Sequence, residues 1–187
     1  MKDKNSILEY LHEFKKIWKH ENIIEELTKA KDMILEVNRN NGKIFIFGNG
    51  GSLSIADHFA VDMTKNASVS TLSLGNSSMI TCLSNDYGYD KWISKSIEYY
   101  VNENDLVILI SSSGSSLNII NAANICNEKK INLITFSGFD VDNQLKEKGI
   151  LNFWVNSRAY NVVENIHQIW LLTIVDMIIG KSEYPAS

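Results

Sequence analysis

Apolar positions in the first 42 residues recur with the period of an α-helix. Ser6-Ile7-Leu8-Glu9 has the form of a capping box, which predicts a first helix that runs to about Lys19. A second helix is predicted from about Asn22 to the turn at Asn40-Asn41-Gly42. Its apolar face comprises Ile23, Leu27, Ala30, Ile34 and Val37. Both helices must bury their apolar faces, either against a sheet of the same chain or against another subunit.

From Lys43 onward the pattern changes to short, continuous apolar runs that alternate with helical periodicity. The runs predict five strands, at residues 43–47, 69–74, 106–110, 131–136 and 150–155. Strands that are apolar on both faces and separated by helices are typical of a parallel sheet covered on both sides. We therefore predict an α/β protein, a three-layer sandwich around a five-stranded parallel sheet. A single domain would span residues 1–187, with the two leading helices over 1–42 and the α/β core over 43–187.

The composition narrows the functional class. Hydrophobic residues make up 44% of the chain, which is enough for a packed core and excludes a largely disordered protein. The net charge is −4 and no basic block occurs, which argues against nucleic acid as a partner. The apolar stretch 162–179 contains Glu164 and Asp176, so it predicts a buried helix of a soluble protein and no membrane partner.

The first five residues and the cysteines bear on the compartment. Residues 1–5 are polar or charged after the initial Met and lack the apolar region of a signal peptide. Cys82 and Cys126 are too few for a disulfide scaffold and lack the spacing of metal ligands. We expect a cytoplasmic protein with both thiols in its core.

Two strand ends carry loops suited to a phosphate group. Gly48-Asn49-Gly50-Gly51-Ser52 leaves the first strand and enters a helix, and Ser111-Ser112-Ser113-Gly114-Ser115-Ser116 does the same after the third. Glycines allow close backbone approach, and hydroxyls and helix N-termini donate to phosphate oxygens. The chain has neither a P-loop lysine nor a dinucleotide-binding glycine pattern, so these loops favour a phosphorylated small molecule. The alternative is that each loop is only a tight strand-to-helix turn.

Three groups of polar residues are candidates for acid–base chemistry or substrate contacts. His58 and Asp62 are four residues apart on one predicted helix, and Glu164 and His167 are three apart on another. Either pair could bind a divalent metal, transfer a proton or make an ordinary helix contact. Glu164 is expected in the first turn of its helix, where a carboxylate is also favoured by the helix dipole. Residues 85–90 predict a turn whose side chains could meet sugar hydroxyls or form a plain Asx turn.

In this order, the motifs resemble the sugar isomerase (SIS) domain family, and most closely its phosphoheptose isomerase branch. The matching blocks are residues 48–52 with Ala56, His58-Phe59-Ala60, residues 85–88 and residues 110–116. The resemblance covers almost the whole chain, including the two leading helices. It implies a flavodoxin-like sheet, a homotetramer with active sites between subunits, and phosphorylated ketoses and aldoses as ligands.

The resemblance also implies roles for individual residues. Those implied to bind the substrate are Asn49, Gly50, Gly51, Ser52, Asn85, Asp86, Ser111, Ser112, Ser113 and Ser116. Among them, Ser52 and the four serines of the second loop would hold the phosphate. The family isomerises sedoheptulose 7-phosphate through an enediol, with a glutamate and a histidine transferring protons around a zinc ion.

Several positions depart from the family pattern. Asp62 stands where the family has its catalytic glutamate, and Glu164 stands where a glutamine binds both substrate and zinc. Leu172 replaces a histidine, and leucine can neither bind a metal nor transfer a proton. By the resemblance, His58, Asp62 and Glu164 are the catalytic candidates, and the same three residues are the candidate ligands of a divalent metal.

Two functions follow from this pattern. The first is an isomerase of sedoheptulose 7-phosphate or a related ketose phosphate, which would supply an activated sugar for surface polysaccharide. The second is a non-catalytic protein that binds a sugar phosphate or a partner, like the replication-initiator-associating regulators of the family. The replacement of a histidine by Leu172 favours the second function, and the retained carboxylates favour the first.

Overall fold

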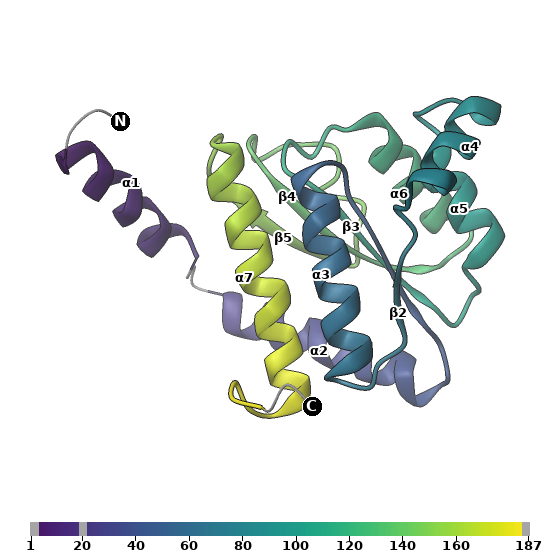
Figure 1. Cartoon of the computed structure of the whole chain (residues 1–187), viewed down its shortest axis with the longest axis horizontal. Coiled ribbons are helices and arrows are strands. Elements are labelled where there is room, and N and C mark those ends of the chain that lie inside the picture. The colour runs from purple at the N-terminus through teal and green to yellow at the C-terminus, as the bar shows by residue number, and fades with distance from the viewer. Residues whose placement is uncertain (1–3, 19–21, 185–187) are drawn as a thin grey trace.

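A five-stranded parallel sheet runs through the middle of the molecule (Figure 1). The computed structural model describes residues 4–18 and 22–184 of the chain. The strands are β1 (Ile44–Phe47), β2 (Thr71–Ser73), β3 (Leu106–Ser111), β4 (Asn132–Gly138) and β5 (Leu151–Val155). Their order in the sheet is β2-β1-β3-β4-β5, with every neighbouring pair parallel. This is the flavodoxin-like order, and it confirms the predicted sheet.

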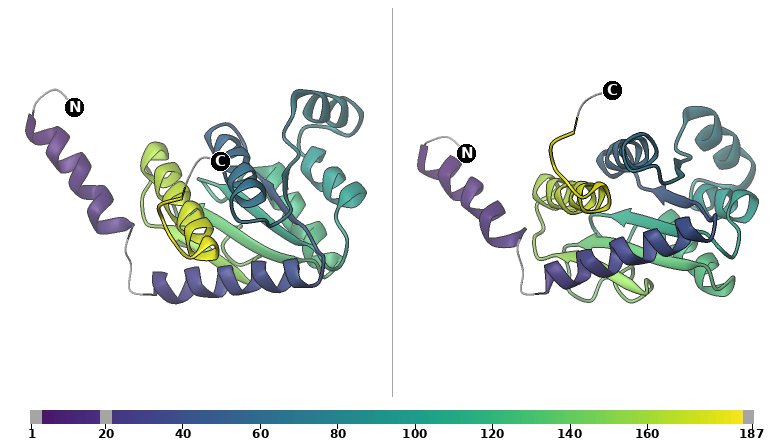
Figure 2. Two further views of the ribbon diagram at one scale, coloured as in Figure 1. Left: turned by 60° about the horizontal axis from the view of Figure 1, so that its bottom comes forward. Right: turned by 90° about the horizontal axis from the view of Figure 1, so that it is seen from below.

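Helices cover both faces of the sheet, which confirms the three-layer sandwich. They are α1 (Lys4–Ile17), α2 (Ile23–Arg39), α3 (Gly51–Lys65), α4 (Ser77–Tyr87), α5 (Trp92–Tyr100), α6 (Leu117–Glu128) and α7 (Tyr160–Ile179). One buried cluster joins α2, α3 and α7 to one face of the sheet, and a second joins α5 and α6 to the other face. In Figure 2, α2 crosses beneath the sheet, and α1 projects away from the rest of the chain.

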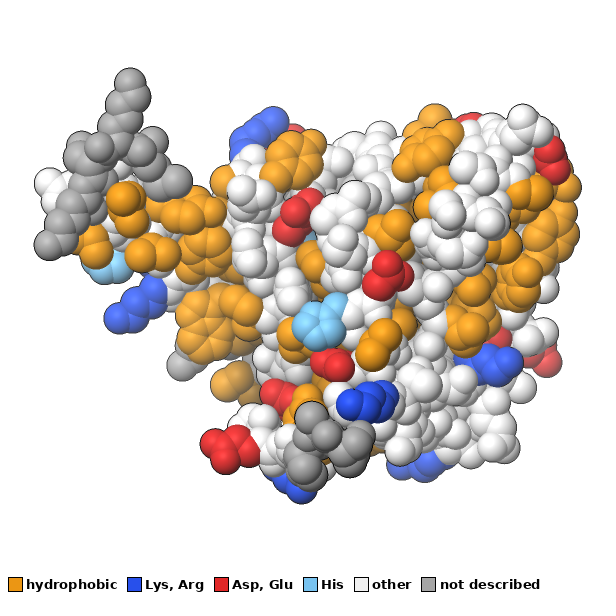
Figure 3. Space-filling model, viewed as in Figure 1, with side chains coloured by type: hydrophobic (Ala, Val, Ile, Leu, Met, Phe, Trp, Pro, Cys, Tyr) orange, Lys and Arg blue, Asp and Glu red, His pale blue; other side chains and the backbone are white. Residues whose placement is uncertain are grey.

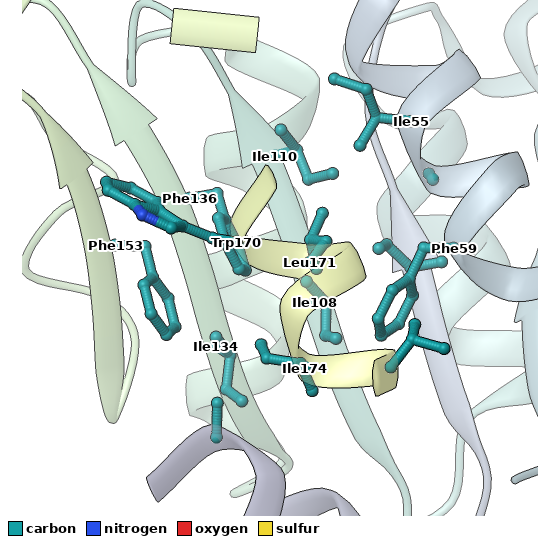
Figure 4. Packing of buried hydrophobic residues seen from close by; sticks show 14 of the residues in the cluster. Ile55, Phe59, Ile108, Ile110, Ile134, Phe136, Phe153, Trp170, Leu171 and Ile174 are labelled. Atoms are coloured by element: carbon teal, nitrogen blue, oxygen red, sulfur yellow. The ribbon is translucent and has the colours of Figure 1, made fainter. Parts of the chain in front are cut away.

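Successive side chains along each strand point to opposite faces of the sheet, so the apolar core is divided between the two helix layers. In β1, Ile44 and Ile46 belong to the α3/α7 side, whereas Phe45 and Phe47 belong to the α5/α6 side. The same division places Ile108 of β3 toward α3 and α7, where Figure 4 shows it among their apolar side chains. Burying a side chain of this size contributes about 1.5–3 kcal/mol, so both helix layers are held firmly on the sheet.

The helix α7 is long and apolar enough to cross a membrane by length and composition. In the structure it packs instead against α2, α3 and the sheet. Its residues Trp170, Leu171 and Ile174 are almost completely buried in the same cluster as Phe59 of α3 (Figure 4). It is therefore the core helix that the polar residues in this stretch predict.

Three local predictions about α1 and α4 are wrong. Ser6 lies inside α1, which includes residues before it, so the Ser6–Glu9 motif does not open the helix. The segment at 85–87 is helical, because Asn76 caps α4 through a bond from the Met79 amide to its Oδ1 (3.0 Å), and the helix continues to Gly88. Cys82 lies on this helix and is exposed, whereas Cys126 is buried as expected.

His167 is completely buried between α7 and β4. Its Nε2 donates to the carbonyl oxygen of Ser137 (3.0 Å), and its ring meets Phe136 edge-on at 5.6 Å between centroids. Burial outweighs this hydrogen bond and lowers the pKa of His167 from 6.5 to about 4, so the folded protein holds it neutral. A side chain in this position supports the core and does not replace the histidine that is missing at residue 172.

This burial predicts a pH-dependent stability. Between pH 6.5 and about 4 the unfolded chain binds a proton at His167 that the folded chain rejects. The free energy of unfolding should therefore fall as the pH drops through this window, by on the order of 3 kcal/mol for this residue in full. His167→Gln keeps an N–H donor for Ser137 but does not titrate, so urea unfolding at a series of pH values should show a shallower decline. Parallel curves for the two proteins would contradict this prediction.

Candidate active site

Two loops lie side by side at the carboxyl edge of the sheet. Residues 48–50 follow β1 and residues 112–116 follow β3, and these two strands are direct neighbours, with Phe47 opposite Leu109. The side chains of Asn49 and Asn118 bind each other through two hydrogen bonds of 2.9 and 2.8 Å. Tyr89 adds a third, from its hydroxyl to Oδ1 of Asn49 (3.0 Å). The glycine loop is thus tied to the start of α6, immediately after the serine loop.

In the serine loop, residues 111–116, the hydroxyl groups differ in whether they have hydrogen-bond partners among the described residues. Ser111 donates to the hydroxyl of Ser116 at 3.1 Å, and Ser113 accepts a bond from the Ser115 amide at 3.3 Å. Ser116 is the N-cap of α6, yet its side chain does not cap the helix. The buried hydroxyl of Ser112 has no hydrogen-bond partner among the described residues. Because buried hydroxyls normally find partners, this loop has spare donor capacity for an anion.

A groove between α3 and α7 begins at Gly51, beside the glycine loop. The two helices run in the same direction side by side (Figures 1 and 2). Their facing side chains enclose a hollow of about 380 Å³, lined by Gly51, Ser54, Ile55, His58, Glu164, Asn165 and Gln168. Over these helices, Figure 3 shows a histidine with acidic side chains on either side. Titratable groups that line a hollow are candidates for acid–base chemistry.

Glu164 packs against the start of α3. A Cβ atom on Gly51 would lie only 2.3 Å from Oε2 of Glu164, so only glycine leaves room for this carboxylate. Glu164 lies beyond the first turn of its own helix, which begins at Tyr160, so the prediction of a first-turn carboxylate is wrong. Its position is instead at the N-terminal end of the neighbouring helix, where free amides favour a negative charge.

His58 and Asp62 form a pair one helical turn apart on α3. Nε2 of His58 lies 3.3 Å from Oδ2 of Asp62, and Oδ1 of Asp62 accepts a bond from Asn66 at 3.1 Å. From α7, Nε2 of Gln168 lies 3.2 Å from Nδ1 of His58. The imidazole is half exposed (48%) and the carboxylate is more sheltered (21%). The solvent-accessible His–Asp pair of α3 is therefore also contacted by a side chain of α7.

The donor set at this site does not match a metal centre. Across residues 4–18 and 22–184, no three His, Cys, Asp or Glu side chains are grouped closely enough to hold a metal ion. His58 and Asp62 face each other, whereas the Glu164 carboxylate lies against Gly51, two turns nearer the start of α3. Leu172 offers no donor atom. We therefore derive no chemical step through a metal.

Other residues implied by the resemblance lie outside this groove. Asn85 and Asp86 are on α4, where the Asn85 amide donates to the Asp86 carboxylate (2.9 Å), and Asp86 lines a separate hollow with Lys91 and Lys95. Ser52 is buried in the first turn of α3. A larger hollow of about 650 Å³ lies elsewhere, beside Trp154 and Lys146, and contains neither the His–Asp pair nor a serine loop.

The sequence patterns did not identify the two residues that form hydrogen bonds with the side chain of Asn49. Asn118 is buried at the start of α6, and Tyr89 reaches Asn49 from the segment between α4 and α5. Asn118 could have been identified from its place inside the apolar run Leu117-Asn118-Ile119-Ile120, because a buried side-chain amide requires hydrogen-bond partners.

Comparison with known proteins identifies the family. The SIS domain model matches residues 9–138. Phosphoheptose isomerase from Aliarcobacter butzleri is 32% identical over 164 residues, covering 84% of this chain and 86% of that protein. The Buchnera aphidicola enzyme of the same name is 32% identical over 173 residues, covering 89% of this chain and 88% of that protein. The structure of phosphoheptose isomerase from Neisseria gonorrhoeae superposes with a TM-score of 0.77 at 29% identity, covering 83% and 87% of the two chains. The chain belongs to the SIS domain family, in its phosphoheptose isomerase branch.

The contact between Gly51 and Glu164 yields a test of the site geometry. Gly51→Ala should cost less than about 1 kcal/mol of stability, because the flexible end of Glu164 can move aside, and a crystal structure should show that carboxylate displaced. The control is Gly50→Ala, which has open space but a positive φ of 53°, and should cost on the order of 1–3 kcal/mol. If both variants lose equal stability in urea and Glu164 does not move, the proposed contact is wrong.

Proposed function

We propose that the chain is a sugar-phosphate isomerase that interconverts sedoheptulose 7-phosphate, or a related ketose phosphate, with its aldose. The observation that carries the proposal is the His58–Asp62 pair, whose imidazole lines a groove that begins at Gly51, beside the glycine loop. The relatives at 30–32% identity are named phosphoheptose isomerases, which supports the same reaction class.

Isomerisation of this kind moves one proton between adjacent carbons. In the proposed reaction, the carboxylate of Asp62 removes a proton from C1 of the ketose, and the C–H electrons form the C1–C2 double bond of an enediol as the C2 carbonyl oxygen takes a proton from water. The O1 proton then returns to water, the O1–H electrons form the aldehyde carbonyl at C1, and the electrons of the C1–C2 double bond take the proton of the Asp62 carboxylic acid at C2. The bonds balance without an oxidant, and the N–H of His58 can stabilise the oxygen that becomes negative.

The loops would bind the other end of the substrate. In the proposal, the phosphate rests on Ser111, Ser112, Ser113 and Ser116, with Ser52 beside them, and the backbone of Asn49, Gly50 and Gly51 lies along the sugar. The unpartnered Ser112 hydroxyl supports this assignment. Asn85 and Asp86 would contribute from α4, in line with family sites that lie between subunits. Glu164 would accept a hydrogen bond from a sugar hydroxyl.

The family resemblance implies a divalent metal, although the described side chains of this chain do not group into a metal site by themselves. The family resemblance implies zinc, and His58, Asp62 and Glu164 are the groups on this chain that could contribute to holding it. Assays with added zinc and with EDTA are therefore separate arms of every activity measurement.

A non-catalytic role is the second candidate, favoured by Leu172 at the position of a family histidine. In that case the serine loop would sense a phosphorylated sugar, and no turnover would accompany binding. Proton exchange separates the two candidates, because a binding protein has no reason to exchange the C1 hydrogens of its ligand.

The activity prediction is centred on Asp62. With a panel of ketose phosphates, NMR should detect isomerisation by the wild-type protein, and Asp62→Asn should lower the rate by roughly 100-fold or more, because the amide cannot accept the proton. Asp57→Asn is the matched control, since Asp57 is exposed on the same helix and lies outside the His58–Asp62 pair. No conversion and no deuterium exchange by the wild type, with or without zinc, would overturn the isomerase proposal.

We further propose that the chain forms a cytoplasmic homotetramer and acts in the synthesis of surface-polysaccharide precursors. Support for assembly comes from α1, which exposes Ile7, Leu8 and Leu11 away from the core. We expect light scattering at micromolar concentration to give the mass of four chains, and Leu8→Glu with Leu11→Glu to lower it. A wild-type monomer would contradict this prediction.

A further inference from the structure

The amide of Gln168 contacts the ring nitrogen of His58 that faces away from Asp62. The Nε2–Nδ1 distance is 3.2 Å, while the other ring nitrogen lies 3.3 Å from the Asp62 carboxylate. These contacts come from two helices, with Gln168 on α7 and the His–Asp pair on α3. The imidazole is therefore held between an amide and a carboxylate.

The two contacts are compatible with one neutral form of His58. An amide NH₂ group can only donate, so Nδ1 of His58 must accept. In a neutral imidazole the proton then resides on Nε2, and this is the nitrogen that faces the acceptor Oδ2 of Asp62. The Nε2–H tautomer is thus the neutral form in which Nδ1 can accept from Gln168 while Nε2 faces the Asp62 carboxylate.

We propose that Gln168 is a positioning residue that holds His58 as its Nε2–H tautomer, so that His58 serves as a hydrogen-bond donor and Asp62 alone carries the proton. The catalytic part of this inference rests on the isomerase function proposed above. Because His58 lines the groove, its Nε2–H could be shared between Asp62 and a substrate oxygen. The lone pair on Nδ1 is engaged by Gln168 and is not available as a base.

The position of Gln168 explains how the chain functions with leucine at residue 172. Leu172 lies one helical turn after Gln168 on α7 and cannot exchange a proton. In our account, α7 contributes to the acid–base site through an amide that orients a histidine of α3, and not through a titrating group of its own. By analogy with residues that orient metal-ligating histidines, replacement of Gln168 should change activity by about 10- to 100-fold.

The most direct test replaces the hydrogen-bond donor that faces Nδ1 of His58 with an acceptor. A free imidazole already favours the Nε2–H form, so removal of Gln168 alone is a weak test of the tautomer. In Gln168→Glu a carboxylate replaces the amide and can only accept, which places a proton on Nδ1. Asn161→Glu is the matched control, because it adds the same charge to α7 two turns earlier, where residue 161 is exposed.

The experiment is long-range ¹H–¹⁵N NMR of the four histidines at fixed pH in the ligand-free protein, with His58 assigned by its loss in His58→Gln. We expect an unprotonated Nδ1 and a protonated Nε2 in the wild type and in Asn161→Glu, and a protonated Nδ1 in Gln168→Glu. A protonated Nδ1 in the wild type, or no change in Gln168→Glu, would overturn the proposal.

Kinetics then tests the consequence for turnover. Gln168→Leu should lower kcat by about 10-fold or more with little change in KM, because it disorders the donor and leaves the phosphate loop intact. An unchanged kcat in an active enzyme overturns the catalytic role of Gln168. If the wild type itself has no activity, the isomerase function fails, and the NMR result still decides the tautomer.

Discussion

The site depends on the packing of α3 beside α7 on one face of the sheet. Ile55 and Phe59 of α3 and Leu171 of α7 meet over β3 in a single apolar cluster (Figure 4). The opposite faces of the same two helices carry His58 and Gln168, which are 110 residues apart in the chain. Because interiors are close-packed, a shift of either helix would have to disturb this cluster first. The core therefore sets the distance between the groups that carry the chemistry.

A second constraint operates at the edge of the sheet. Parallel pairing of β1 with β3 places the glycine loop beside the serine loop, and the amide pair of Asn49 and Asn118 joins them. Gly51 then leaves space for Glu164, which links the loops to the α3–α7 groove. In the proposed function, residues from these three helices would hold the phosphate and the reacting carbons of one small molecule.

The sequence predicted the parts of the fold that follow from local periodicity. All five strands and the buried face of α2, from Ile23 to Val37, lie where apolar spacing places them. The helix α4 was missed because residues 85–90 contain turn-forming residue types, whereas Gly88 ends a helix there. The bond between Gln168 and His58 was not predictable, because it depends on the relative rotation of two helices that are far apart in the chain. Contacts of this kind are set by tertiary packing, which the apolar periodicity of the sequence does not reveal.

The central claim is that one ligand spans the serine loop and the His58–Asp62 pair. A crystal structure with a polyol phosphate, a ketose phosphate analogue that lacks the carbonyl group and cannot react, tests it most directly. We predict the phosphate on the hydroxyls of residues 111–116 and the first two carbons of the chain in contact with His58 and Asp62. A ligand bound in the hollow beside Trp154, or one whose phosphate lies away from the serine loop, would contradict this account.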